Sequence, residues 1–176
     1  MTVAVPNPVS LLPEAPAFSL SSTDLADGGT LRNDQVYAGM GLEGGNRSPA
    51  LSWAGFPAET QSFTIACFDP DAPTMSGFWH WAAIDLPASV TSLPAGAGTE
   101  TGLPGGIHLR NDYGTRDYGG AAPPPGDAAH RYYFVVNALS VASLEVGPDA
   151  SPAYAMFAAG FHTIGRAVLT GHYARG

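Results

Sequence analysis

A stiff acidic corner follows a predicted strand, and it is the feature that most restricts how this chain can fold. Residues 61–68 alternate in the way a strand does, and one face carries three apolar residues and then an acid: Phe63, Ile65, Cys67 and Asp69. An ionised carboxylate at the end of an apolar row is costly unless it is paired or hydrogen bonded. Pro70 and Pro73 then fix the turn, because each proline locks its own φ and restricts the residue before it.

Two further segments carry groups that could meet this corner. The run Gly-Phe-Trp-His-Trp at 77–81 places His80 among bulky aromatic residues. Residues 111–133 contain a glycine- and proline-rich loop that leads into His130, Arg131 and Tyr132. On a strand, His130 and Tyr132 share a face and Arg131 points to the other. Glycines in the loop allow backbone N–H groups to approach a ligand closely, which suits an anion.

The chain is expected to be one domain built from short strands. With 176 residues it can bury a single core, and 22 glycines and 16 prolines favour many turns over a helical bundle. Strands are predicted over residues 18–20, 51–53, 61–68, 79–86 and 131–139. Residues 1–16 contain four prolines and are expected to form an extended leader, with the domain spanning 17–176.

One helix is predicted, over residues 151–169. Ser151 suits the N-cap and Pro152 the first turn, and Gly171 is expected to end the helix. The apolar set that indicates a helical face is Met156, Phe157, Phe161, Ile164 and Val168.

Charge and composition exclude several classes of function. A net charge of −8 argues against nucleic acid, because phosphate-backbone binding needs a basic surface. Cys67 is the single cysteine, so an intramolecular disulfide is excluded and an inert buried thiol is expected. The first twelve residues contain no basic residue and no long apolar run, so neither a signal peptide nor a membrane span is predicted, and the cytoplasm is the expected location.

Motifs for cofactors, metals and nucleophilic catalysis are weak or missing. Residues 39–44 match G-x-G-x-x-G, but the Gly-Asn-Arg-Ser-Pro that follows cannot open the helix that a dinucleotide site requires. Two histidines and an aspartate raise the question of a metal, yet there is no H-E-x-x-H spacing and no cysteine pair. No G-x-S-x-G elbow is present either. We therefore expect no cofactor and no metal.

Several spaced motifs resemble one family. Asp-Pro-Asp-Ala-Pro at 69–73, Trp-His-Trp at 79–81 and the Tyr-Gly-Gly…Pro-Pro-Pro-Gly…His-Arg-Tyr pattern at 118–132 are similar to the phosphatidylethanolamine-binding protein family. Asn-Arg-Ser-Pro-Ala-Leu-Ser-Trp at 46–53 and the late His162 and 171–173 resemble its bacterial, Raf-kinase-inhibitor-like branch. The similarity runs from about residue 18 to the C-terminus, and the agreement of several motifs in order makes it specific.

The resemblance implies a mainly β fold, in which a central antiparallel sheet packs on a second, smaller sheet, with a C-terminal α-helix near one pocket. In the family that pocket binds small anions or a phospholipid headgroup. The carried-over ligand-binding residues are Asp69, Ala72, Pro73, Phe78, His80, Gly119, Gly120, Pro123, Pro124, His130 and Tyr132. Asp71 and Arg131 are expected to form a structural pair beneath it. Ala121 and Ala122 depart from the usual family pattern, which leaves the loop shape open.

Three functions stay open at this point. A binding module would hold a phosphate-like or carboxylate group, with a regulatory protein partner such as the kinases bound by eukaryotic relatives. A pocket enzyme, a hydrolase or a cyclase, would use His80, His130 and Asp69 for acid–base catalysis. The third alternative is a purely structural interaction protein, in which both histidines are ordinary structural residues. A homodimer through exposed strands also stays open.

Overall fold

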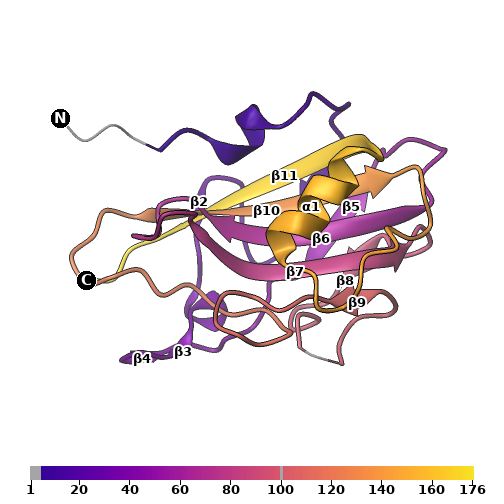
Figure 1. The fold of residues 1–176 in the computed structure, drawn as a ribbon. Helices are drawn as coiled ribbons and strands as arrows, with labels where there is room; N and C mark the ends of the chain where they lie inside the picture. Colours follow the sequence, from indigo (N-terminus) through magenta and orange to yellow (C-terminus); the bar gives the residue numbers. More distant parts are fainter. Residues whose placement is uncertain (1–4, 100) are drawn as a thin grey trace.

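The computed structural model describes residues 5–99 and 101–176, and most of its regular structure is β (Figure 1). A six-stranded sheet has the order β2-β11-β10-β6-β7-β9, a three-stranded sheet the order β1-β5-β8, and β3 and β4 form a hairpin. The elements are η1 (Pro8–Leu11), β1 (Ser19–Ser21), β2 (Gly29–Thr30), η2 (Asn33–Gln35), β3 (Ala38–Gly39), β4 (Leu42–Glu43), β5 (Leu51–Ala54), β6 (Ser62–Asp69), β7 (Phe78–Pro87), β8 (Ser92–Leu93), β9 (Ile107–His108), β10 (His130–Leu139), α1 (Pro152–Gly160) and β11 (Thr163–Tyr173).

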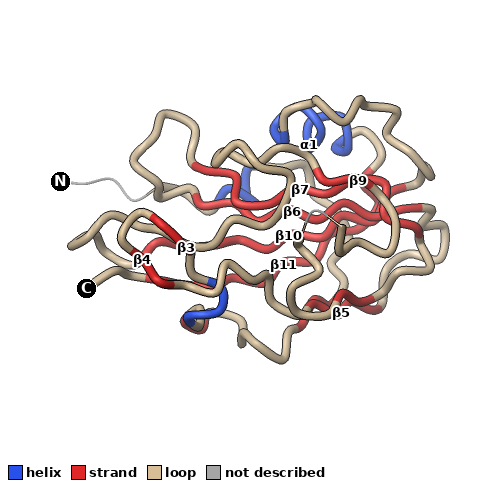
Figure 2. The backbone as a smooth tube through the Cα atoms, turned by 90° about the horizontal axis from the view of Figure 1, so that it is seen from below, coloured by secondary structure: helices blue, strands red, loops and turns tan. Residues whose placement is uncertain are grey.

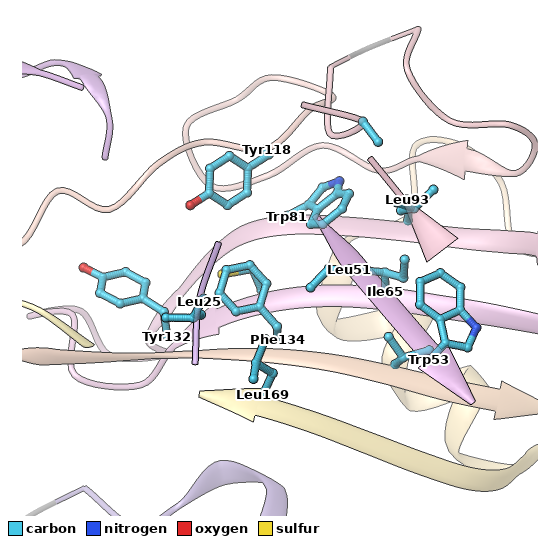
Figure 3. Close-up of a cluster of buried hydrophobic side chains, with 14 of the residues drawn as sticks. Leu25, Leu51, Trp53, Ile65, Trp81, Leu93, Tyr118, Tyr132, Phe134 and Leu169 are labelled. Atoms are coloured by element: carbon cyan, nitrogen blue, oxygen red, sulfur yellow. The ribbon is translucent and has the colours of Figure 1, made fainter. Parts of the chain in front are cut away.

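The predicted architecture of a large sheet packed on a smaller one is confirmed. Strands β6, β7, β10 and β11 pair antiparallel, and the short β2 joins the large sheet in parallel. Between the two sheets lies the main core, where Figure 3 shows Trp81, Phe134 and Ile65 of the large sheet beside Leu51 and Trp53 of β5. Phe63, Ile65 and Cys67 all belong to this core, as their alternation predicted.

The predicted helix is too long. Ser151 does cap it, since its hydroxyl accepts from the Tyr154 N–H, but α1 ends at Gly160 and residues 163–173 form β11. Small or apolar residues alternate along β11, so that Gly165, Ala167, Leu169 and Gly171 are buried. β11 pairs along the whole of β10, and this pairing satisfies the backbone hydrogen-bonding groups of residues 163–173. A glycine is needed at position 171 of the strand, because a Cβ there would come 2.8 Å from Leu31 Cδ2.

The helix buries one part of the predicted apolar face and exposes another. Phe157 is 64% exposed and Phe161 73% exposed, whereas Ala155 and Met156 pack with Ala82, Ile84 and Leu109 against the outer face of β7. The remaining described helices are single 3-10 turns, and no helix among residues 5–99 and 101–176 has the length and apolar character to cross a membrane.

An N-terminal strap (residues 5–17) lies over another part of that outer face. Instead of being extended throughout, it contains the 3-10 turn η1. Two arginines of the sheet hold it, because Arg131 Nη2 donates to Val5 O at 2.8 Å and Arg166 Nη1 donates to Pro13 O at 2.9 Å. Figure 1 shows the strap in indigo beside β11, where Ala17 makes a parallel bridge to Arg166.

The glycine-rich motif at 39–44 forms the β3–β4 hairpin, and irregular chain rather than a helix follows it at 45–50. Seen from below in Figure 2, this hairpin lies at one end of the strands β6, β7 and β10, well away from α1. The rejection of a dinucleotide site is therefore consistent with the local structure.

Candidate functional site

A cavity of about 190 Å³ lies at the end of the large sheet where β6 ends and β7 and β10 begin. We call it the His80–His130 cavity. Most of the predicted site residues line it: Asp69, Ala72, Pro73, Phe78, His80, Pro124 and His130. These residues come together because β6 runs antiparallel to both of its neighbours, so that its last residue lies beside their first ones.

Asp69 orients His130. Asp69 Oδ2 accepts from His130 Nδ1 at 2.8 Å, while Oδ1 accepts the backbone N–H groups of Asp71 and Ala72 at 2.8 and 3.1 Å. The Asp-Pro-Asp-Ala-Pro turn therefore wraps its own backbone around a carboxylate that is only 2% exposed. Burial raises the pKa of Asp69, and the hydrogen bond from His130 opposes this shift.

The other nitrogen of His130 meets a second acid. Nε2 lies 3.2 Å from Asp127 Oδ2, whose side chain is 43% exposed. Carboxylate oxygens only accept, so in this arrangement both ring nitrogens of His130 are donors, which is the imidazolium form. His130, a wall residue of the cavity, thus carries a cationic N–H donor whose present acceptor is a partly exposed carboxylate.

His80 has the opposite character. Its Nδ1 lies 2.8 Å from Gly119 O and 3.1 Å from Gly120 O, and because carbonyls accept, Nδ1 carries the proton. Burial lowers the pKa of His80 from its ordinary value to about 4, although the two carbonyls act in the other direction. The ring is therefore neutral near pH 7, and its Nε2, which no described residue contacts by a hydrogen bond, is an acceptor.

A β-bulge directs His80 into the cavity. The register pairs Cys67 with Trp81 and Phe68 with Trp79, so His80 is an extra residue on β7. Trp81 consequently remains in the core between the sheets, while Trp79 lies on the outer face beside Phe68. Without the extra residue, strict alternation would place the two tryptophans on the same face.

Four predicted residues do not line the cavity. Gly119 and Gly120 act through their carbonyls on His80, and Pro123 is buried behind the wall. Tyr132 is 1% exposed and packs its ring against His80, with centroids 5.2 Å apart, and no partner for its hydroxyl is found in the described chain. Burial raises the pKa of Tyr132, so it remains a neutral phenol.

Sequence reasoning missed Tyr113, which also lines the cavity. Its ring stacks on Tyr37 with centroids 4.1 Å apart, and its hydroxyl donates to Gly120 O at 2.8 Å. A Cβ at Gly119 would collide with the Tyr113 ring, so this glycine is the sequence signal of the close approach. Met40, Thr74 and Ala122 are further wall residues.

The loop containing Ala121 and Ala122 keeps a defined shape. Ala121 is fully buried and bridges to Val36, with its N–H donating to Gln35 O and its carbonyl accepting from Tyr37 N, both at 3.0 Å. Ala122 then turns toward the cavity. The two alanines that depart from the family pattern therefore leave the loop ordered, and Ala122 forms part of the cavity wall.

Asp71 and Arg131 form a bidentate ion pair beside the site. Arg131 Nε donates to Asp71 Oδ2 at 2.8 Å and Nη2 to Oδ1 at 2.7 Å, and the Arg131 backbone N–H adds a third bond at 2.9 Å. These bonds lower the pKa of Asp71. The pair fixes the acidic corner to the start of β10, next to His130.

The comparison with known proteins follows the same motifs. The sequence model described as "Phosphatidylethanolamine-binding protein" matches residues 21–174. The chain belongs to this family. The protein YbhB of Escherichia coli is 44% identical over 159 residues, covering 89% of this chain and 100% of the relative, and YbcL of the same organism is 42% identical over 163 residues, covering 91% and 89%.

Solved structures of the family agree with the fold. The crystal structure of E. coli YbcL, described as a new member of the mammalian family, superposes with a TM-score of 0.87 at 40% identity, covering 90% of this chain and 99% of that one. A Chlamydia trachomatis homologue superposes with a TM-score of 0.77 at 28% identity, covering 92% and 100%. Among the described residues, no group of three or more His, Cys, Asp or Glu side chains is arranged so that it could hold a metal ion.

Proposed function

We propose that this protein binds a singly protonated phosphate group, as found in a phosphate monoester, in the His80–His130 cavity. The observation that carries the proposal is the pairing of a cationic N–H donor on His130 with a neutral acceptor, Nε2 of His80. A monoanionic phosphate can accept from His130 through an O⁻ and donate to His80 Nε2 through its P–OH. Such charge-assisted bonds are stronger than neutral ones.

The ligand replaces one interaction of the free protein. Asp127 is partly exposed and belongs to the loop that precedes β10, so it can leave His130 Nε2 when an oxyanion arrives. Asp69 stays in place because three donors hold it. His130 therefore remains oriented while its other nitrogen changes partner.

The arrangement distinguishes phosphate monoesters from diesters. The family is named for a phospholipid whose phosphate is a diester, and a diester has no P–OH to donate to His80. We expect O-phosphorylethanolamine to bind about tenfold more tightly than glycerophosphoethanolamine, because the diester leaves the His80 acceptor unpaired. Isothermal titration calorimetry at pH 6 measures both. Equal affinities, or tighter binding of the diester, would contradict the assignment of His80 as acceptor.

Affinity should fall as pH rises. The second pKa of a phosphate monoester is about 6, so above pH 7 its monoanion fraction drops about tenfold per pH unit. The pKa of His80 is about 4, and the ring therefore takes up no compensating proton in this range. Titrations of O-phosphorylethanolamine from pH 5.5 to 8.5 should show this decline, and sulfate, which stays a dianion, should bind at least about tenfold more weakly at pH 6. Sulfate binding as tight as the phosphate ester would contradict the proposal.

Removing the competing carboxylate should strengthen binding. Asp127→Asn keeps the shape of the side chain but removes a negative charge from beside His130 Nε2, and a several-fold, roughly threefold to tenfold, gain in phosphate affinity is expected. Asp149→Asn removes a carboxylate that is 88% exposed, pairs with Arg116 and does not line the cavity, and it serves as the control. An unchanged or weaker affinity in Asp127→Asn would mean that the oxyanion does not approach His130 from this side.

The same titrations test for turnover. Release of inorganic phosphate from O-phosphorylethanolamine, lost in His80→Ala and in His130→Ala, would support a pocket enzyme instead. Binding left unchanged by both variants would leave only a structural role for these histidines.

A further inference from the structure

A second cavity lies on the opposite face of the large sheet, beneath the N-terminal strap. It has a volume of about 200 Å³ and is bounded by β6, β7 and β10 on one side and by the strap and the end of α1 on the other. We call it the Arg166 cavity. Its walls are almost entirely apolar and include Phe68, Trp79, Tyr133, Val135 and Met156.

The cavity carries one cation that lacks an anionic partner. Arg166 Nε donates to Asn137 Oδ1 and Nη1 to Pro13 O, both at 2.9 Å, and within residues 5–99 and 101–176 no ion pair involves this side chain. Glu14 and Arg166 both line a neighbouring groove, but no ion pair joins them. Burial lowers the pKa of Arg166, as expected for a charge without compensation.

A neutral side chain, Asn137, is the other polar group in contact with Arg166 at this end of the cavity. Asn137 accepts from Arg166 and donates through Nδ2 to Thr64 Oγ1 at 3.1 Å, so its orientation is fixed. Nη2 of Arg166 is left without a hydrogen bond to the described chain. An apolar hollow that ends at a guanidinium group fits an apolar molecule with one carboxylate, because carboxylate and guanidinium geometries match.

We propose that the Arg166 cavity is a binding site for a small apolar monocarboxylate, separate from the phosphate site. An apolar cavity of about 150 Å³ holds a benzene-sized guest, so about 200 Å³ fits a chain of roughly eight carbons. Exposed wall residues at Leu12, Pro13 and Gly160 place the entrance between the strap and the C-terminal end of α1.

The two sites are distinct because neighbouring residues face opposite sides of the sheet. Phe68 and Trp79 line the Arg166 cavity, whereas Asp69 and His80 line the other one. The proposal does not depend on the phosphate site, and the following experiment separates the two.

Sodium octanoate is the probe, titrated by calorimetry and by tryptophan fluorescence with 1-octanol as the neutral analogue. Trp79 lies in the cavity wall, while Trp53 and Trp81 are buried in the core, so a saturable fluorescence change should disappear in Trp79→Phe. Octanoate should bind at least about tenfold more tightly than octanol, because only the carboxylate pairs with Arg166. Saturating O-phosphorylethanolamine should leave octanoate binding unchanged.

Two variants test the location. Arg166→Gln should weaken octanoate about tenfold or more and leave octanol unchanged, with the exposed Arg32→Gln as the matched control. Because Arg166 also anchors the strap, Val135→Phe provides a second variant, which fills the cavity from β10 and should abolish binding of both probes. Absence of saturable octanoate binding, equal binding of octanol, or displacement by O-phosphorylethanolamine would each overturn the proposal.

Discussion

Replacing His130 with alanine should reduce affinity for O-phosphorylethanolamine by about a hundredfold, since a charged hydrogen bond contributes about 1.5–3 kcal/mol. The variant removes the cationic donor and also frees Asp69, whose carboxylate then lies buried beside the ligand. Calorimetry at pH 6 measures the loss. The effect should exceed that of any other single substitution in the cavity wall.

The control for this experiment is His162→Ala. His162 follows α1 at the other end of the sheet and does not line the cavity, so its loss should leave phosphate affinity unchanged. Unfolding of His130→Ala in urea shows whether the protein is still folded at the temperature of the titration. A folded His130→Ala protein with wild-type affinity would refute the proposed phosphate site.

Replacing Trp81 with alanine should lower the free energy of unfolding by about 3–5 kcal/mol. Trp81 is fully buried between the two sheets, and its indole N–H donates to His108 Nδ1 at 3.2 Å. The substitution leaves a large void and removes the hydrogen bond from the indole to His108. Since small domains have total stabilities of about 5–15 kcal/mol, urea denaturation should show a strongly reduced midpoint.

Phe157→Ala is the matched control, because it removes an aromatic ring that is 64% exposed. A change within about 0.5 kcal/mol is expected there. If both substitutions cost the same, the core assigned between the sheets would be wrong. Trp81→Phe should fall between the two, since it keeps most of the apolar volume and loses only the indole N–H.

Much of the site could be predicted because its residues lie at strand ends. Asp69 closes an alternating strand and His130 opens another, and antiparallel pairing brings these two ends together. The proline-fixed corner then supplies the backbone donors that hold Asp69. The local pattern predicted that the acid and the imidazole lie at strand ends, the family resemblance implied that they meet, and the strand pairing explains why they do.

The remaining features depend on contacts that the local pattern does not encode. The helix predicted over 151–169 was too long because Gly165, a poor helix former, is needed where Pro57 approaches β11 closely. The bulge at His80 is a property of the pairing between two strands, so neither strand alone reveals it. Tyr132 was expected at the cavity because it alternates with His130, but its ring lies behind His80 instead.

The back-to-back cavities limit how this end of the protein can diverge. Two pairs of chain neighbours are divided between the two cavities: Phe68 and Trp79 line the Arg166 cavity, and Asp69 and His80 line the His80–His130 cavity. Inserting or deleting a single residue at the start of β7 would move the indole and the imidazole to the opposite faces of the sheet. Both cavities would then lose a wall residue. Ligand preference here can therefore evolve by substitution but not by changes of chain length.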